Sequence, residues 1–383
     1  MNKISYADAQ YFKQFLQWKG QESDSVYGGI LKFKGFNDYN RLLQINSMFS
    51  NNPFGQPLDR TGNVYLPVKY DTGRPWKFFS KPIGLDDALS RRVKNLVSTG
   101  EKINLLWSGG IDSTTMTNAF LSNVDDHSQL RILYSPFSVY EHREYLTNFI
   151  SKFPKVEVVD ISGDVYLTQE FDGIFVSGDS GDETHASMDE SFLAEFGYEI
   201  LKKPWKEFFY SRTNDTNFID FCEKYFSWSG RSIDTVLDAR WWFYINSKMY
   251  CMLSIKLLFF SSYKNFVPSR LYGFFDCDEY ENYITHNTHR IMSTPDYCTW
   301  KQDLKDYCQK IDGFDQWAKE KIKNGSFQFH SYTYKKTILN DQRAMFILND
   351  GTRVHTPGLP LLSQKEFENC YGSSLDYLLN API

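Results

Sequence analysis

The stretch that decides the fold is SGGIDST, residues 108–114. It follows the apolar run NLLW (104–107), and its last two residues begin the sequence STTMTNAFL (113–121). The apolar run is typical of a buried parallel strand, and the sequence after it is typical of a helix. Two adjacent glycines allow a sharp backbone turn, and a helix N-terminus supplies N–H donors and a positive dipole. The stretch therefore predicts a loop that binds an anion with several oxygens, such as a phosphate.

Every residue of this loop is a candidate for ligand binding. The candidates are Ser108, Gly109, Gly110, Ile111, Asp112, Ser113 and Thr114. Three of them carry hydroxyl donors, whereas the carboxylate of Asp112 suits a phosphate that arrives with Mg²⁺. Two other interpretations stay open at this point. The loop can be a glycine-rich turn without a ligand, and Asp112 can be the N-cap of the helix.

Strand-like and helical segments alternate from residue 84 onward, which indicates an α/β fold with a parallel sheet. Helices are predicted around 85–97 and 141–152, and the stretch from about 217 to 312 is predicted to be largely helical. The tail contains a hairpin signal at Asn349-Asp350-Gly351. Strands are predicted at LRILY (130–134), VEVVD (156–160) and GIFVSG (173–178).

A second turn follows a strand at IFVSGDSGDETHAS, residues 174–187, and contains Asp179, Asp182 and Glu183. Turns that follow neighbouring parallel strands gather at one edge of a sheet, so this turn is expected to face the first one. Two acidic turns at one phosphate site predict a shared Mg²⁺ ion. The competing interpretation is a solvated start of a helix.

The loop lacks the lysine of a GxxxxGK[ST] phosphate loop and the spacing of a GxGxxG motif. SGGIDST instead resembles the SGGxDS loop of the ATP pyrophosphatase (PP-loop) family, which implies cleavage of ATP to AMP and pyrophosphate. The second turn resembles the corresponding loop of asparagine synthetases and β-lactam synthetases. The resemblance covers about residues 84–325 and implies an adenine-nucleotide hydrolase-like fold that uses ATP and Mg²⁺.

The resemblance implies a role for each matching residue. Asp112 and Asp182 would bind Mg²⁺, and Asp179, where the synthetases have glutamate, would help to deprotonate the attacking amine. Lys323 is the candidate for stabilising an acyl-adenylate, with Lys301 and Lys336 as competitors. Further nucleotide contacts are implied for Ser177, Gly178 and Asp179, and for the backbone at Leu133, Tyr134 and Ser135. The sequence THAS (184–187) departs from the GGY of the synthetases.

Charge and aromatic residues divide the chain near residue 83. Residues 1–83 hold 11 Lys/Arg and only 6 Asp/Glu, and they also contain 16 aromatic residues. The whole chain nevertheless has a net charge of −5. This negative net charge excludes a uniformly basic nucleic-acid binder. We expect a basic N-terminal extension that is β-rich or mixed (1–83) and a synthetase-like domain (84–383). The second comprises a nucleotide core (about 100–200), a helical acceptor part (about 201–325) and a β-rich tail (326–383).

The leading hypothesis is an AMP-forming ligase that adenylates a carboxylate and transfers it to ammonia or an amine. No glutaminase is expected within the chain, because Asn2 stands where the glutaminase of the synthetases has a cysteine, so a separate glutaminase is a candidate partner. There are two alternatives. One is a PP-loop enzyme that modifies RNA or DNA and binds it through residues 1–83, and the other is a non-catalytic nucleotide-binding protein. A cytoplasmic location without a membrane partner is expected.

Overall fold

The structure is a computed structural model that describes residues 37–49, 57–65, 74–134, 136–142, 144–160, 171–186, 192, 196–249, 270–291, 301–314, 317, 346–347 and 353–354. These residues belong to two compact units. The first is drawn from Met1–Pro82, Ser180–Ser269 and Glu281–Thr288. The second is drawn from Ile83–Asp179, Arg270–Tyr280 and His289–Ile383, and it contains the glycine-rich loop.

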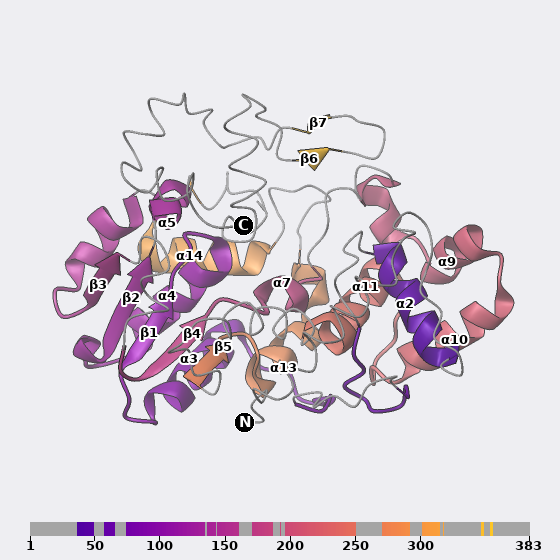
Figure 1. Ribbon diagram of the computed structural model, residues 1–383, viewed down its shortest axis with the longest axis horizontal. Helices are drawn as coiled ribbons and strands as arrows, with labels where there is room; N and C mark the ends of the chain where they lie inside the picture. The colour runs from indigo at the N-terminus through magenta and orange to yellow at the C-terminus, as the bar shows by residue number, and fades with distance from the viewer. Residues whose placement is uncertain are drawn as a thin grey trace, which may run out of the picture. The chain divides into compact units, whose positions relative to one another are not determined.

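A five-stranded parallel sheet forms the second unit, in the order β3-β2-β1-β4-β5 (Figure 1). The α/β prediction is therefore confirmed, as are the predicted strands. Successive strands add outward from β1 toward β3, and the chain then returns to the other side of β1 to form β4. The strands are β1 (Ile103–Leu106), β2 (Leu130–Tyr134), β3 (Glu157–Asp160), β4 (Ile174–Ser177) and β5 (Leu271–Gly273).

The fifth strand was not predicted, although the described part of the stretch from about 217 to 312 is otherwise largely helical, as expected. β5 lies inside that stretch and pairs with β4, with Phe175 opposite Leu271 and Ser177 opposite Gly273. With only three residues, its sequence LYG is too short to show a periodicity of two. Its place in the sheet depends on pairing with a strand almost a hundred residues earlier, which no local pattern reveals.

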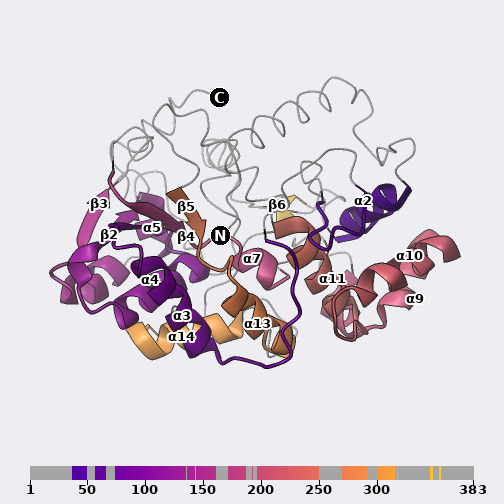
Figure 2. The ribbon, with the colours of Figure 1, turned by 90° about the horizontal axis from the view of Figure 1, so that it is seen from below.

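Three helices lie together beside the sheet (Figure 2). These are α3 (Leu85–Val97), α4 (Ile111–Asn123) and α14 (Gln302–Asp312). α3 confirms the predicted periodicity, because Leu89, Val93 and Leu96 are buried. α4 packs against both α3 and α14 and is buried along most of its length, so it is the central helix of this layer.

The helix predicted around 141–152 has a less regular form. α5 spans Pro136–Glu141, and a wide helical turn at Tyr145–Phe149 leads into a tight one at Ile150–Lys152. Tyr145 is fully buried, and its ring stacks on Trp107, with 4.9 Å between the ring centroids. This segment with local departures from α-helical hydrogen bonding thus places Tyr145 against Trp107, the residue after β1.

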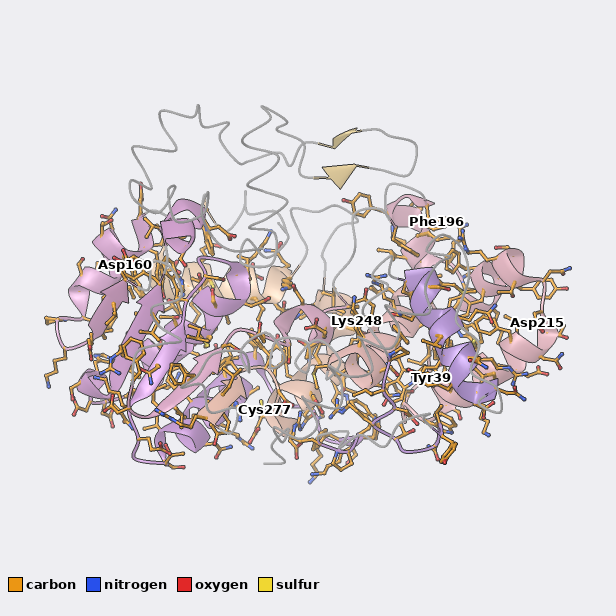
Figure 3. All side chains as sticks on the ribbon, viewed as in Figure 1. Tyr39, Asp160, Phe196, Asp215, Lys248 and Cys277 are labelled. Carbon is orange, nitrogen blue, oxygen red and sulfur yellow. The ribbon has the colours of Figure 1, made fainter. Side chains whose placement is uncertain are left out.

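The first unit is mainly helical around an aromatic core. Its helices are α2 (Asn37–Phe49), α7 (Gly181–Thr184), η4 (Tyr198–Lys202), α9 (Trp205–Thr213), α10 (Thr216–Ser227), α11 (Val236–Phe243) and η5 (Tyr244–Lys248), while α13 (Asp278–His286) and η7 (Thr288–Arg290) span both units. The ring of Phe49 contacts Phe209 and Phe243, at centroid distances of 5.5 and 6.1 Å. Lys248, labelled in Figure 3, donates to Tyr244 Oη at 2.9 Å. Part of the aromatic excess is therefore accounted for by core packing.

The described part of the N-terminal segment is fastened to this unit by buried polar contacts. The guanidinium of Arg60 donates to Glu281 Oε2 at 3.0 Å and to the Ile245 carbonyl at 3.0 Å. The Asp59 carboxylate accepts from the amides of Thr61, Asn63 and Val64, which closes a tight turn. Within the extension that was expected to be β-rich or mixed, these residues therefore form a turn.

The described part of the tail contains one antiparallel strand pair, β6 (Phe346–Ile347) with β7 (Arg353–Val354). This pair confirms the predicted hairpin around residues 349–351, although the turn residues themselves lie outside the described ones. Across the part of the chain that the structure describes, no helix is long and apolar enough to cross a membrane.

Arg92 gives a test of how α3 holds the edge of the sheet. Its Nε donates to the Phe274 carbonyl at 3.0 Å and its Nη2 donates to the Gly273 carbonyl at 2.6 Å. Arg92→Met removes both donors, so we expect the free energy of unfolding in urea to fall by about 2–4 kcal/mol. The matched control is Arg91→Met on the exposed face of the same helix, which should change it by less than about 0.5 kcal/mol. Equal effects of the two substitutions would contradict the assignment.

Candidate functional site

The glycine-rich loop leads directly from β1 into α4. Gly110 is the N-cap, with φ −79° and ψ 165°, and the first helical hydrogen bond runs from Thr114 N to Gly110 O at 2.9 Å. The amides of Ile111, Asp112 and Ser113 belong to the first helical turn and have no acceptor within the helix. Because Gly110 is the N-cap, the interpretation of Asp112 as the N-cap is wrong. Asp112 occupies the first turn, where the helix dipole favours its negative charge.

Two serine hydroxyls fix the shape of the loop. Ser113 Oγ accepts from Ser108 N at 3.1 Å and donates to Gly110 O at 3.1 Å. The two hydroxyls, Ser108 Oγ and Ser113 Oγ, lie 3.0 Å apart. These bonds link the two ends of the turn and fix the course of its backbone.

Thr114 stabilises the fold of the loop and is not exposed on its surface. Its side chain is fully buried, and its hydroxyl oxygen accepts from Trp107 Nε1 at 3.1 Å. Trp107 N in turn donates to the Leu133 carbonyl at 3.0 Å. Thr114 was predicted to offer a hydroxyl to the ligand, and the structure shows that hydroxyl in use between the helix and the end of β1.

Glycine is required at position 109. The backbone has φ +78°, and a β-carbon there would lie 2.3 Å from the Ser138 carbonyl oxygen of α5. A β-carbon at Gly110 would lie 3.7 Å from Glu141 Oε2, so this carboxylate also borders the loop. Neither Ser138 nor Glu141 was predicted as a site residue. The signal that would have found them is their position in the first helix after β2, the strand next to β1.

The second predicted turn lies against the first. β1 pairs with β4 in parallel, with Leu106 opposite Ser177, so both strands end at the same edge. A β-carbon at Gly178 would lie 2.7 Å from Ser113 N and 2.9 Å from the Asp112 carbonyl carbon. Gly178 therefore lies close against the backbone at the start of α4. Ser177 Oγ donates to Asp179 Oδ2 at 2.9 Å, so the Asp179 carboxylate is hydrogen-bonded within its own turn.

Asp182 and Glu183 lie on α7, which belongs to the other unit, so the predicted shared metal site of Asp112 and Asp182 stays a prediction. Glu183 is buried, and Ser180 has a left-handed backbone with φ +71°. His185 is fully buried, and its Nδ1 lies 2.9 Å from the Gly181 carbonyl oxygen.

Lys301 contacts the loop directly, which no sequence pattern predicted. Its Nζ lies 2.6 Å from Asp112 Oδ1 and 2.5 Å from Oδ2. The lysine side chain is 7% exposed and the aspartate side chain 19%, so the ion pair is largely shielded from water. The resemblance had offered Lys301 only as a competitor of Lys323 for contact with an intermediate. Lys323, Lys336 and Ser135 lie outside the described residues.

Polar contacts join α4 to α14 behind the loop. Asn118 Nδ2 donates to Asp312 Oδ2 at 2.8 Å, and Tyr145 Oη donates to Asn118 Oδ1 at 2.7 Å. Thr115 Oγ1 and Cys308 Sγ lie 3.2 Å apart. Burial raises the pKa of the Cys308 thiol far above its usual value, which keeps it protonated and excludes it as a nucleophile. Cys222 and Cys277 are likewise free and buried.

The end of β2 is where the resemblance implies further nucleotide contacts. Leu133 is buried and Tyr134 is half-buried, opposite Asp160 at the end of β3. Asp160 is labelled in Figure 3. Burial, and to a lesser degree the Asp160 charge, raises the pKa of the Tyr134 phenol. The phenol therefore stays neutral, and it offers a hydroxyl and a ring face beside the strand ends.

Strand order places these features at one position. β1 continues to β2 on one side and pairs with β4 on the other, so the sheet has a topological switch point between β1 and β4. In open parallel sheets, ligands bind at such a point, outside the carboxyl ends of the strands. The loop 108–110, the start of α4 and residues 177–179 all lie there.

The donors at this edge suit a phosphate accompanied by a hard cation. Backbone amides and serine hydroxyls can contact phosphate oxygens, and Mg²⁺ is usually held by only one or two carboxylates together with phosphates. In the described ranges, no three His, Cys, Asp or Glu side chains gather into a metal-binding group. Asp112, in the first turn of α4, can supply one such carboxylate.

The chain was also compared with known proteins. No family model, curated protein or solved structure matches it significantly.

Gly178 tests the contact between the two turns. Gly178→Ala would force a β-carbon against the backbone of Asp112 and Ser113, so we expect the free energy of unfolding to fall by about 1–3 kcal/mol. The matched control is Gly84→Ala, where a β-carbon meets nothing within 4 Å, and it should be tolerated. Chemical denaturation measures both changes. A Gly178→Ala protein as stable as the control would show that the turns are not in contact.

Proposed function

We propose that this protein binds Mg²⁺-ATP at the 108–113 loop and cleaves it to AMP and pyrophosphate in order to activate a carboxylate. The observation that supports this best is the two-glycine turn that opens into the N-terminus of α4 at the switch point of a parallel sheet. This arrangement offers several N–H donors to one anion. Asp112 distinguishes it from a site for a bare phosphate, because an acidic side chain there favours a metal-bound one.

In the proposed reaction, a substrate carboxylate attacks the α-phosphorus of ATP and forms an acyl-adenylate. The bond from the carboxylate oxygen to the α-phosphorus forms as the bond from that phosphorus to the bridging oxygen of pyrophosphate breaks. Ammonia or an amine then attacks the acyl carbon, which forms the amide bond and releases AMP. Bound Mg²⁺ would supply positive charge to the leaving pyrophosphate. The chain would contribute positioning and electrostatic stabilisation.

Each part of the loop has a proposed task in this reaction. The amides of Ile111, Asp112 and Ser113 would bind the oxygens of the pyrophosphate, which carry more charge as it leaves. Ser108 would donate its hydroxyl to the same group, while Asp112 would hold the metal. Asp179 is the proposed proton acceptor for the amine, and its bond from Ser177 Oγ orients its carboxylate.

The test is to incubate the protein with Mg²⁺-ATP and a panel of carboxylic acids, with and without ammonia, and to separate AMP from ADP by chromatography. We expect AMP and pyrophosphate in equal amounts, dependent on one of the acids. Release of ADP and phosphate would refute the proposal. Nucleotide binding without AMP release would support a non-catalytic nucleotide-binding protein. AMP release that depends on RNA or DNA would favour a nucleic-acid-modifying enzyme.

Asp112 gives the sharpest variant for this function. Asp112→Asn keeps the size of the side chain and removes its charge, so we expect the rate of AMP release to fall about 10²–10³-fold. Asp125→Asn is the matched control, because Asp125 is an exposed residue just beyond the other end of α4. Unchanged activity of Asp112→Asn would refute the metal assignment, whatever the substrate proves to be.

A further inference from the structure

The ion pair between Lys301 and Asp112 occupies the carboxylate that the proposed function assigns to Mg²⁺. Both oxygens of Asp112 lie within 2.6 Å of the same ammonium group. The pair is largely buried, and a buried carboxylate without a counter-charge is strongly destabilised. In the absence of a ligand, Lys301 thus provides the positive charge that Asp112 requires.

Lys301 is held in place at the start of α14. Its backbone is left-handed, with φ +57° and ψ +41°, a conformation that costs a residue with a side chain roughly 1–2 kcal/mol. Its amide donates to the Ile291 carbonyl at 2.6 Å, and its carbonyl accepts from Lys305 N at 3.0 Å. The fixed backbone leaves the four-carbon side chain as the part that can move.

Two cations cannot both bind the carboxylate oxygens of Asp112 at close range without strong repulsion. A metal ion that arrives with a nucleotide must therefore displace the ammonium group, at least in part. The displaced group remains tethered beside the first-turn amides of α4, where the oxygens of a phosphate are expected. A phosphate oxygen is then the nearest group that can replace the lost partner.

We propose that Lys301 is an exchangeable counter-ion, which neutralises Asp112 in the free protein and transfers to the phosphates when Mg²⁺-nucleotide binds. The exchange keeps every charge at the site paired in both states. It also makes Asp112 a poor site for a free divalent ion, so that metal enters together with phosphate. This proposal rests on the proposed function for its ligand, a Mg²⁺-bound polyphosphate, but not on the identity of the acid or the amine.

Lys301→Met tests the exchange because the two affinities should change in opposite directions. Removal of the ammonium group frees Asp112, so the affinity for Mn²⁺ alone, measured by electron paramagnetic resonance, should rise roughly tenfold. The affinity for inorganic pyrophosphate without metal, measured by calorimetry, should fall roughly tenfold. A lysine that only supports the fold would lower both affinities or neither.

Lys310→Met is the matched control, since Lys310 lies on the same helix in an exposed pair with Asp86. It should leave both affinities unchanged. If Lys301→Met does not fold, Lys301→Gln replaces it with the same expected directions. Unchanged or weaker Mn²⁺ binding would overturn the proposal, and so would unchanged pyrophosphate binding. These outcomes are independent of AMP release by the unsubstituted protein, so failure of the exchange and failure of the proposed function are distinguishable.

Discussion

The parallel pairing of β1 with β4 is the constraint on which the site depends. Because Leu106 lies opposite Ser177, the turns that follow the two strands begin at the same level of the sheet. Gly178 can then approach the backbone of Asp112 and Ser113 more closely than any residue with a side chain. A shift of one residue in this register would move the Ser177-Gly178-Asp179 turn away from the start of α4 and reverse which face each side chain occupies.

Electrostatics at this edge follow from the same geometry. The N-terminus of α4 brings partial positive charge to the strand ends, and Asp112 and Glu141 bring negative charge to the same place. Lys301 pairs with Asp112, which limits the excess of negative charge beside the amides that would receive a phosphate. The site is therefore a set of opposed charges and not a simple basic pocket. Such a set suits a ligand that carries both phosphates and a cation.

Much of this arrangement could be predicted where the signal is local. Apolar runs identified β1, β2, β3 and β4, and the Gly109-Gly110 pair identified the turn between β1 and α4, because these features depend on residues within one element. Contacts between distant segments could not be predicted. Lys301 lies 189 residues beyond Asp112, has a left-handed backbone, and donates its amide to the Ile291 carbonyl. β5 likewise depends on its partner strand, and Thr114 depends on Trp107.

The hydrogen bonds between Ser108, Ser113 and Gly110 have a further thermodynamic consequence. Flexible loops lose conformational entropy when they close around a ligand, and this loss lowers affinity. Here the turn is already ordered by its own hydroxyls, and the helix behind it is buried. Binding of an anion at this position would thus cost little conformational entropy of the chain. The temperature dependence of binding would then mainly report the desolvation of the anion and the amides.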